Sequence, residues 1–326
     1  MTGIFRTNNP LNSFLLFVYG LLLKFIWFLH PQIPVVQKPN GFLFNDMVTL
    51  VKPYLTLYPS SYFFIAYLLI YTQAISFNQL IMRRRMMQKP NYLPAMSYLL
   101  ITSFLTEWNV LSAPMIINTL LIWIWAKISN LNNNEHPKST LFNAGIVIGI
   151  CAFLYLPSFT FAVFIIFSLI ISRPPKPAEM FINIIGIITP WYFLASWLFL
   201  TNRLYSFSLS GMGVTSPSFQ PVSITLMALI LILLLTIAGV FIVQSVSSKQ
   251  IIQVRKNWKL MLLYLAIAMA ALFVDNIHHV EYWLLALVPV SVFVGYVFYF
   301  TRVKWLSALL HWLMVAFILY SQYFHK

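Results

Sequence analysis

The chain has 326 residues, of which 60% are hydrophobic and 8% charged, with a net charge of +14 and a mean hydropathy of +0.83. A soluble domain carries roughly 25% charged residues, so this chain has too few to cover a water-facing surface. Apolar runs recur from Leu11 to Tyr320 with no soluble-sized stretch between them. The composition therefore excludes a soluble protein and predicts an all-α, polytopic membrane protein that forms one integral domain over residues 1–326.

Eleven apolar segments are expected to span the bilayer as helices. In chain order they are 11–30, 61–81, 92–110, 113–129, 141–156, 158–172, 181–200, 222–245, 259–274, 281–300 and 304–322. The fifth and sixth reach about 24 Å or less, short of a hydrocarbon core of about 30 Å. These two are expected to form either a tight hairpin that thins the membrane or a pair buried by neighbouring helices.

Positive charges gather in alternate loops. With the N-terminus in the cytoplasm, fifteen of the twenty Lys and Arg residues fall on the cytoplasmic side. They are Arg6, Arg83, Arg84, Arg85, Lys89, Lys127, Lys138, Arg173, Lys176, Lys249, Arg255, Lys256, Lys259, Arg302 and Lys304. This asymmetry predicts an N-terminus inside and a C-terminus outside, and it explains the net charge without a nucleic-acid partner.

The first outer loop, residues 31–60, is expected to hold an amphipathic helix in the membrane surface. Its segment NDMVTLVKPYLTLY has apolar residues at helical spacing, with Asn45 or Asp46 placed to cap the helix. Asp46 is therefore interpreted either as a cap or as a functional carboxylate. Lys24, in the outer part of the first span, is expected to extend outward and to pair with Asp46.

Four of the six acidic residues fall on the outer side, namely Asp46, Glu107, Asp275 and Glu281. In the stretch VDNIHHVEYW, residues 274–283, a continuing helix would place Asp275 on one face with His278 and His279. Carboxylate and imidazole suit zinc, or manganese, so Asp275 and His278 are candidate ligands of a divalent metal. The alternative is a structural turn in which Asp275 caps a helix.

The second long outer loop, residues 201–221, has Arg203 as its only charge. This arginine is expected either to grip a phosphate or to lie among lipid headgroups. Arg203, Lys24 and His279 are the candidate substrate contacts. The chain lacks the phosphate-loop, zinc-protease and serine-hydrolase motifs, so ATP-driven transport and those two hydrolase classes have no signature here.

Three stretches, FRTNNPLN, NYLPAMSYLLITS and LFNAG…GICAFLYLPS, resemble an uncharacterised family of multi-spanning inner-membrane proteins of Bacteroidetes-type bacteria. The resemblance covers most of residues 1–200. It implies a location in a bacterial inner membrane, with the outer loops in the periplasm, and it implies no activity.

The chain is also similar, more weakly, to the membrane glycosyltransferases of the GT-C class, which use polyprenyl-phosphate sugars. Those enzymes carry a catalytic acid in a long first outer loop, which Asp46 matches by position. Glu107, Asp275 and His278 match their further outer acids or histidines, and Arg203 matches the cation near the lipid phosphate. Those enzymes usually have a pair of acids in the first outer loop, whereas this chain has Asp46 alone there. The resemblance implies transfer of a sugar or similar group from a polyprenyl-phosphate lipid.

Two other functions stay open. A non-catalytic subunit or scaffold of an envelope export or assembly complex would have a membrane protein partner and would need nothing from the outer acids. A secondary transporter would need polar groups near the middle of the bilayer, where the spans offer scattered ones such as Asn118, Asn183 and His311.

Overall fold

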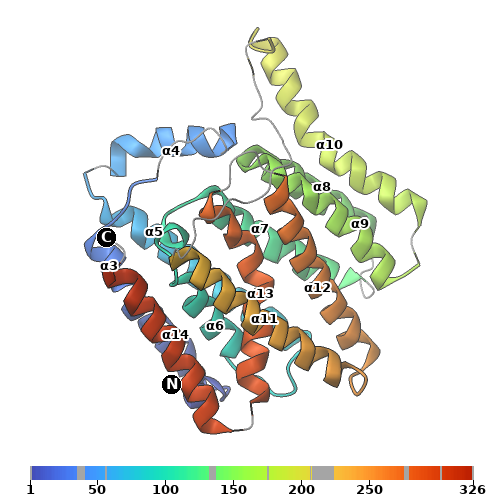
Figure 1. Ribbon diagram of the computed structural model, residues 1–326. Coiled ribbons are helices and arrows are strands. Elements are labelled where there is room, and N and C mark those ends of the chain that lie inside the picture. The colour runs from blue at the N-terminus through green and yellow to red at the C-terminus, as the bar shows by residue number, and fades with distance from the viewer. Residues whose placement is uncertain are drawn as a thin grey trace.

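The computed structural model describes residues 2–34, 41–55, 57–131, 137–174, 176–205, 207, 224–274, 279–301 and 303–324, which contain helices and connections but no strand (Figure 1). The α-helices are α1 (Thr2–Phe5), α2 (Leu11–Leu23), α3 (Phe25–Leu29), α4 (Phe42–Leu55), α5 (Ser60–Arg83), α6 (Leu93–Thr102), α7 (Ala113–Ile128), α8 (Pro137–Leu154), α9 (Phe161–Ser172), α10 (Pro177–Leu200), α11 (Ile224–Ser247), α12 (Ile252–Phe273), α13 (Leu284–Phe300) and α14 (Lys304–Phe324). Three short 3₁₀ turns are η1 (Thr106–Asn109), η3 (Leu156–Thr160) and η4 (Val280–Trp283).

Seven helical segments of the described residues are long and apolar enough to cross a membrane. They are α5, α8, α10, α11, α12, the run Val280–Phe300 and the run Trp305–Gln322. Shorter apolar helices occupy the other four predicted spans, at Leu11–Leu23, Leu93–Thr102, Ala113–Ile128 and Leu156–Ser172. The chain is thus a helical membrane protein, and every predicted span contains an apolar helix.

The predicted fifth span, 141–156, begins too late. α8 starts at Pro137 and runs for 18 residues, about 27 Å at the rise of an α-helix. Hydropathy alone misses its first turn, because the residues from Pro137 to Thr140 are polar, although proline is favoured at the first position of a helix. η3 and α9 then follow without a long loop.

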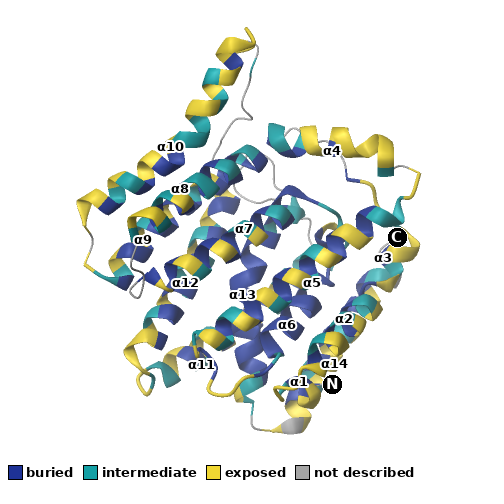
Figure 2. Ribbon diagram, turned by 180° about the vertical axis from the view of Figure 1, so that it is seen from behind, coloured by how far each residue is buried: buried dark blue, intermediate teal, exposed yellow. Residues whose placement is uncertain are grey.

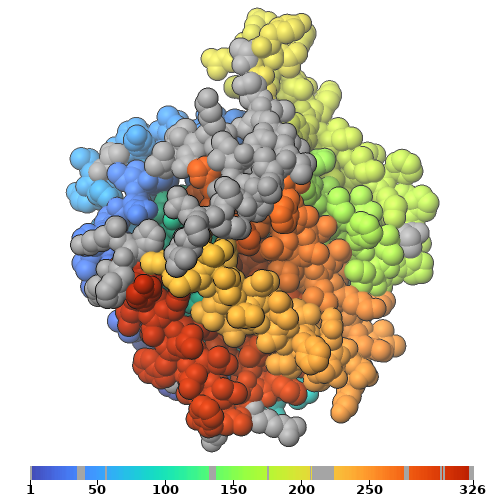
Figure 3. Space-filling model, in the orientation of Figure 1, coloured from blue at the N-terminus to red at the C-terminus, as the bar shows by residue number. Residues whose placement is uncertain are grey.

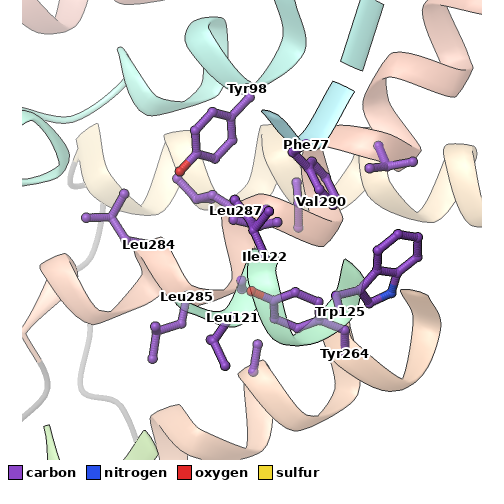
Figure 4. Packing of buried hydrophobic residues seen from close by; sticks show 14 of the residues in the cluster. Phe77, Tyr98, Leu121, Ile122, Trp125, Tyr264, Leu284, Leu285, Leu287 and Val290 are labelled. Carbon is purple, nitrogen blue, oxygen red and sulfur yellow. The ribbon is translucent and has the colours of Figure 1, made fainter. Parts of the chain in front are cut away.

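α13 is the central helix of the bundle. In its run Val280–Phe300, 83% of the most apolar 18-residue stretch is buried inside the protein. The helices α6, α7, α11 and α12 pack around it (Figure 2). A Cβ atom at Gly239 of α11 would lie 2.4 Å from the backbone oxygen of Phe293, so a glycine is needed for that close approach. Figure 4 shows part of the resulting core, where side chains such as Phe77, Trp125 and Leu287 meet.

α8 and α10 form the closest helix pair away from this core (Figure 1). A Cβ atom at Gly145 would lie 2.5 Å from the backbone oxygen of Asn183, and one at Gly186 would lie 2.4 Å from that of Phe142. Glycines let two membrane helices touch through their backbones. The outer side of α10 stays uncovered, with Phe181 66% exposed and Phe193 65% exposed.

Hydrogen bonds define two ends of the bundle. At the end called here the basic end, Arg6 Nη2 donates to the backbone oxygens of Phe298, at 2.6 Å, and Thr301, at 2.7 Å. At the end called here the polar end, Ser321 Oγ donates to the backbone oxygen of Phe104 at 2.9 Å. The N-terminal residues and the last helix turn of α14 therefore lie at opposite ends (Figure 1).

Candidate functional site at the polar end

Lys24 is a buried lysine at the polar end. It interrupts the first predicted span, because α2 ends at Leu23 and α3 begins at Phe25. Its side chain is 0% exposed, and Nζ donates to Thr102 Oγ1 at 3.1 Å and to Asn109 Oδ1. The ring of Trp27 lies 5.8 Å from Nζ. The expectation that Lys24 extends outward and pairs with Asp46 is wrong, since the side chain is buried and its partners are Thr102 and Asn109.

No carboxylate partner balances Lys24 within the described ranges, where the ion pair recorded is Arg173–Glu179 at 2.8 Å. An ammonium group out of water is costly unless it is paired or hydrogen-bonded. Two neutral acceptors and an aromatic face offset part of that cost. The amine therefore has only neutral partners, and an anion brought beside it would favour its charged form.

The η1 turn connects Lys24 with Glu107. Asn109 is held from its other side, because its Nδ2 donates to the backbone oxygens of Thr102 at 2.9 Å and Leu105 at 2.8 Å. Trp108 is fully buried and its Nε1 donates to the backbone oxygen of Val280 at 2.8 Å. Glu107, between these fixed positions, is exposed. The turn therefore presents a carboxylate from a rigid backbone.

The η1 and η4 turns lie against each other, as the bond between Trp108 and Val280 shows. η4 begins directly after His279, whose half-buried ring lies 6.1 Å from that of Tyr282. Tyr282 in turn stacks on Tyr155 at 4.0 Å, which links η4 to the end of α8. The structure thus brings the turns that carry Glu107 and His279 together.

A small cavity of about 10 Å³ lies beside η1, lined by Trp27, Gln32, Phe63, Thr106, Asn109 and Val110. That is close to the volume that one water molecule needs. The cavity touches both Asn109 and Trp27, the direct neighbours of the Lys24 ammonium group. It gives the buried cation a polar surrounding but is too small for a phosphate group as it stands.

Asp46 lies on the surface helix α4 and not on one of these turns. The helix begins at Phe42, and its first backbone bond runs from Asn45 N to Gly41 O at 3.2 Å. Asp46 is thus an exposed residue inside the helix, and the prediction that Asn45 or Asp46 caps it is wrong. Gly41 N donates to Leu154 O at 2.8 Å, so α4 is anchored on the end of α8.

Arg203 is exposed in the turn after α10, and its backbone oxygen accepts from Phe207 N at 3.1 Å. The ring of Phe207 lies 5.2 Å from that of Phe42, which brings this turn to the start of α4. Asp275 and His278 lie outside the described residues. No group of three or more metal-ligating side chains occurs in the part of the chain that is described.

Asn109 and Thr102 are the site residues that sequence reasoning missed. Asn109 lies near the end of the predicted span 92–110 and Thr102 near its middle, and neither an amide at a span end nor a single hydroxyl within a span marks a partner of a lysine. His311, noted as an ionisable residue inside a span, has a structural partner, since its Nε2 lies 2.9 Å from the hydroxyl of Tyr19.

Comparison with known proteins gives a family but no activity. Residues 89–326 match a family described as "Family of unknown function (DUF6427)". This match extends over α6 to α14, farther toward the C-terminus than the resemblance to residues 1–200. No curated protein matches the chain.

Proposed function

The chain belongs to the DUF6427 family, of unknown function, and we propose that it binds a polyprenyl-phosphate lipid at its polar end, on the periplasmic side of a bacterial inner membrane. The observation that carries the proposal is the Lys24 ammonium group, buried beside η1 without a carboxylate partner among the described residues. Phosphate is a preferred partner of lysine. A lipid keeps its chain in the bilayer and its phosphate at the membrane surface, close to the depth where the first span ends.

The reaction proposed for this site is transfer of a sugar or similar group from the lipid phosphate. Glu107 takes the proton of an acceptor hydroxyl, and the hydroxyl oxygen forms a bond to the carbon that carries the phosphate. The bond between that carbon and the phosphate oxygen breaks, and the lipid phosphate leaves with the electron pair. The exposed Arg203 stabilises its charge by contact, and Lys24 does so from beneath the surface, since the cavity beside it does not admit a phosphate group.

The other predicted site residues have the following roles in this proposal. Asp46 is the alternative general base, supplied from α4. Asp275 and His278 are proposed ligands of a divalent metal, and His279 a contact to the substrate. The packing of the turn that carries Glu107 on η4, which follows His279 directly, supports the role of His279 beside Glu107.

Native mass spectrometry of the protein extracted from its own membrane tests the binding. We expect a phosphorylated isoprenoid lipid on the wild type and its loss in Lys24→Met, because methionine fills a similar volume without the charge. Lys52→Met is the matched control, since Lys52 is an exposed lysine on α4, and it should retain the lipid. Equal retention by both variants would contradict the role of Lys24.

A non-catalytic subunit is the second candidate, favoured by the uncovered side of α10. There Phe181, Tyr192, Phe193 and Trp197 are all more than half exposed, and exposed aromatic residues are enriched in protein interfaces. The same spectra decide between the candidates. A stoichiometric protein partner without any phosphorylated lipid would favour the subunit and reject the enzyme.

A further inference from the structure

A groove lies between α5 and α7, which are neighbouring helices of the bundle (Figure 2). It has a volume of about 330 Å³ and is lined by Thr72, Gln73, Ser76 and Leu80 of α5 and by Thr119, Ile122, Trp123 and Ala126 of α7. From Thr72 to Leu80 it extends about 12 Å along α5, at the rise of an α-helix. It begins near the middle of α5 and ends one turn before the basic end.

The side chains of Thr72, Gln73 and Thr119 in the groove are already hydrogen-bonded. Gln73 Nε2 donates to Met115 O at 2.7 Å and to Thr119 Oγ1 at 2.8 Å, and its Oε1 accepts from the Tyr98 hydroxyl at 2.7 Å. Thr72 Oγ1 donates to Leu69 O at 2.9 Å. The threonines therefore offer their methyl groups to an occupant, and the groove wall suits a hydrocarbon chain.

Cations surround the mouth of the groove at the basic end. Arg84 connects the two helices: Nε donates to Ser129 Oγ at 2.9 Å, Nη1 to Asn130 Oδ1 at 2.9 Å and Nη2 to Ala126 O at 3.2 Å. All three acceptors are neutral. Burial, and next the charge of Arg83, lower the pKa of Arg84. The guanidinium group thus lies where a negative charge would stabilise it.

Two further cations adjoin this mouth in the chain, since Lys127 follows Ala126 and Arg85 follows Arg84. Lys127 Nζ lies 5.5 Å from the ring centroid of Trp123, which lines the groove. Arg85 is exposed and has a φ of 53°, a left-handed conformation that ends a helix and normally favours glycine. The conformation closes the end of α5, where Met86 N donates to Ile81 O at 3.2 Å, and it fixes the backbone of Arg85 directly after Arg84.

We propose that the groove binds one anionic phospholipid, with an acyl chain between α5 and α7 and the phosphate among Arg84, Arg85 and Lys127. Basic pockets between membrane helices are established binding places for anionic headgroups. The site is independent of the function proposed above, because it lies at the opposite end of the bundle.

Lipid titration of the purified, delipidated full chain in a neutral detergent tests this proposal by native mass spectrometry. The probes are phosphatidylglycerol and phosphatidylcholine with identical acyl chains. We expect the wild type to bind phosphatidylglycerol at least tenfold more tightly. The double variant Arg85→Gly/Lys127→Gln should lose about fivefold in affinity for each cation removed. Its thermal stability should not fall, because glycine adopts the conformation of residue 85 without strain.

Lys249→Gln/Arg255→Gln is the charge-matched control, since both residues are exposed and lie outside the groove, and it should keep the wild-type affinity. Ser76→Trp should block lipid binding by filling the groove, whereas Ile188→Trp, at an exposed position of α10, should not. Unchanged affinity in the Arg85/Lys127 variant or in Ser76→Trp would overturn the proposal. The proposal would also be overturned if glycerol phosphate displaced the bound lipid as well as phosphatidylglycerol does, because the headgroup alone would then account for the binding.

Discussion

Lys24 shows what a sequence can and cannot say about one residue. Its position inside an apolar run marks it as an intramembrane ionisable group, which is a functional candidate by default. Its direction could not be predicted, because that depends on the break between α2 and α3 and on acceptors from α6 and η1 that are distant in the chain.

Trp108 is the residue that joins the two turns of the candidate site. Trp108→Phe keeps an aromatic ring but removes the Nε1 donor to Val280 O. We expect the free energy of unfolding to fall by about 1 kcal/mol and the lipid to be retained more weakly. Thermal unfolding in one detergent, with native mass spectrometry, measures both. Trp312→Phe is the control, since Trp312 is 59% exposed. Equal effects of the two changes would show that the bond between the turns has no special role.

At the scale of elements, α8 and α10 depend on glycines whose signal was present in the sequence. Gly145 and Gly149 form a G-x-x-x-G pattern, typical of helices that pack closely in membranes. The partner helix could not be inferred, since a pattern on α8 does not say which surface it meets. The glycine on the other side, Gly186, stands alone in its helix.

Gly186→Ala should separate this helix pair. The added Cβ would lie 2.4 Å from the backbone oxygen of Phe142, which cannot move as a side chain would. We expect a destabilisation of about 1–3 kcal/mol from overpacking, measured as a lower unfolding temperature. Gly3→Ala has no neighbour within 4 Å of the new methyl group and should leave the temperature unchanged. A harmless Gly186→Ala would refute the direct backbone contact.

At the scale of the whole molecule, hydropathy located an apolar helix in every predicted span but not the length of each helix. Seven segments are long enough to cross a bilayer, and four are shorter. Short helices such as α6 are stable because they are buried: all ten of its residues, Leu93–Thr102, are buried by neighbouring helices. Burial of that kind depends on tertiary packing, which a hydropathy pattern does not contain.

The candidate site was predictable only in part, for the same reason. The sequence placed Glu107 and His279 on one side of the membrane, and the structure brings their turns together. It places Asp46 on α4, anchored to the end of α8. The charges of the loops indicate on which side of the membrane a residue lies, but not how far apart two residues on that side are.

Turnover of the retained lipid is the measurement that tests this account most directly. The protein, reconstituted in vesicles with the phosphorylated lipid that it retains and an acceptor, should release the free lipid phosphate. Glu107→Gln should slow this release by about 10²–10⁴-fold, the usual contribution of a general base, while the lipid stays bound. Release at the wild-type rate in Glu107→Gln, or no release from the wild type with lipid bound, would contradict the proposed chemistry at the polar end.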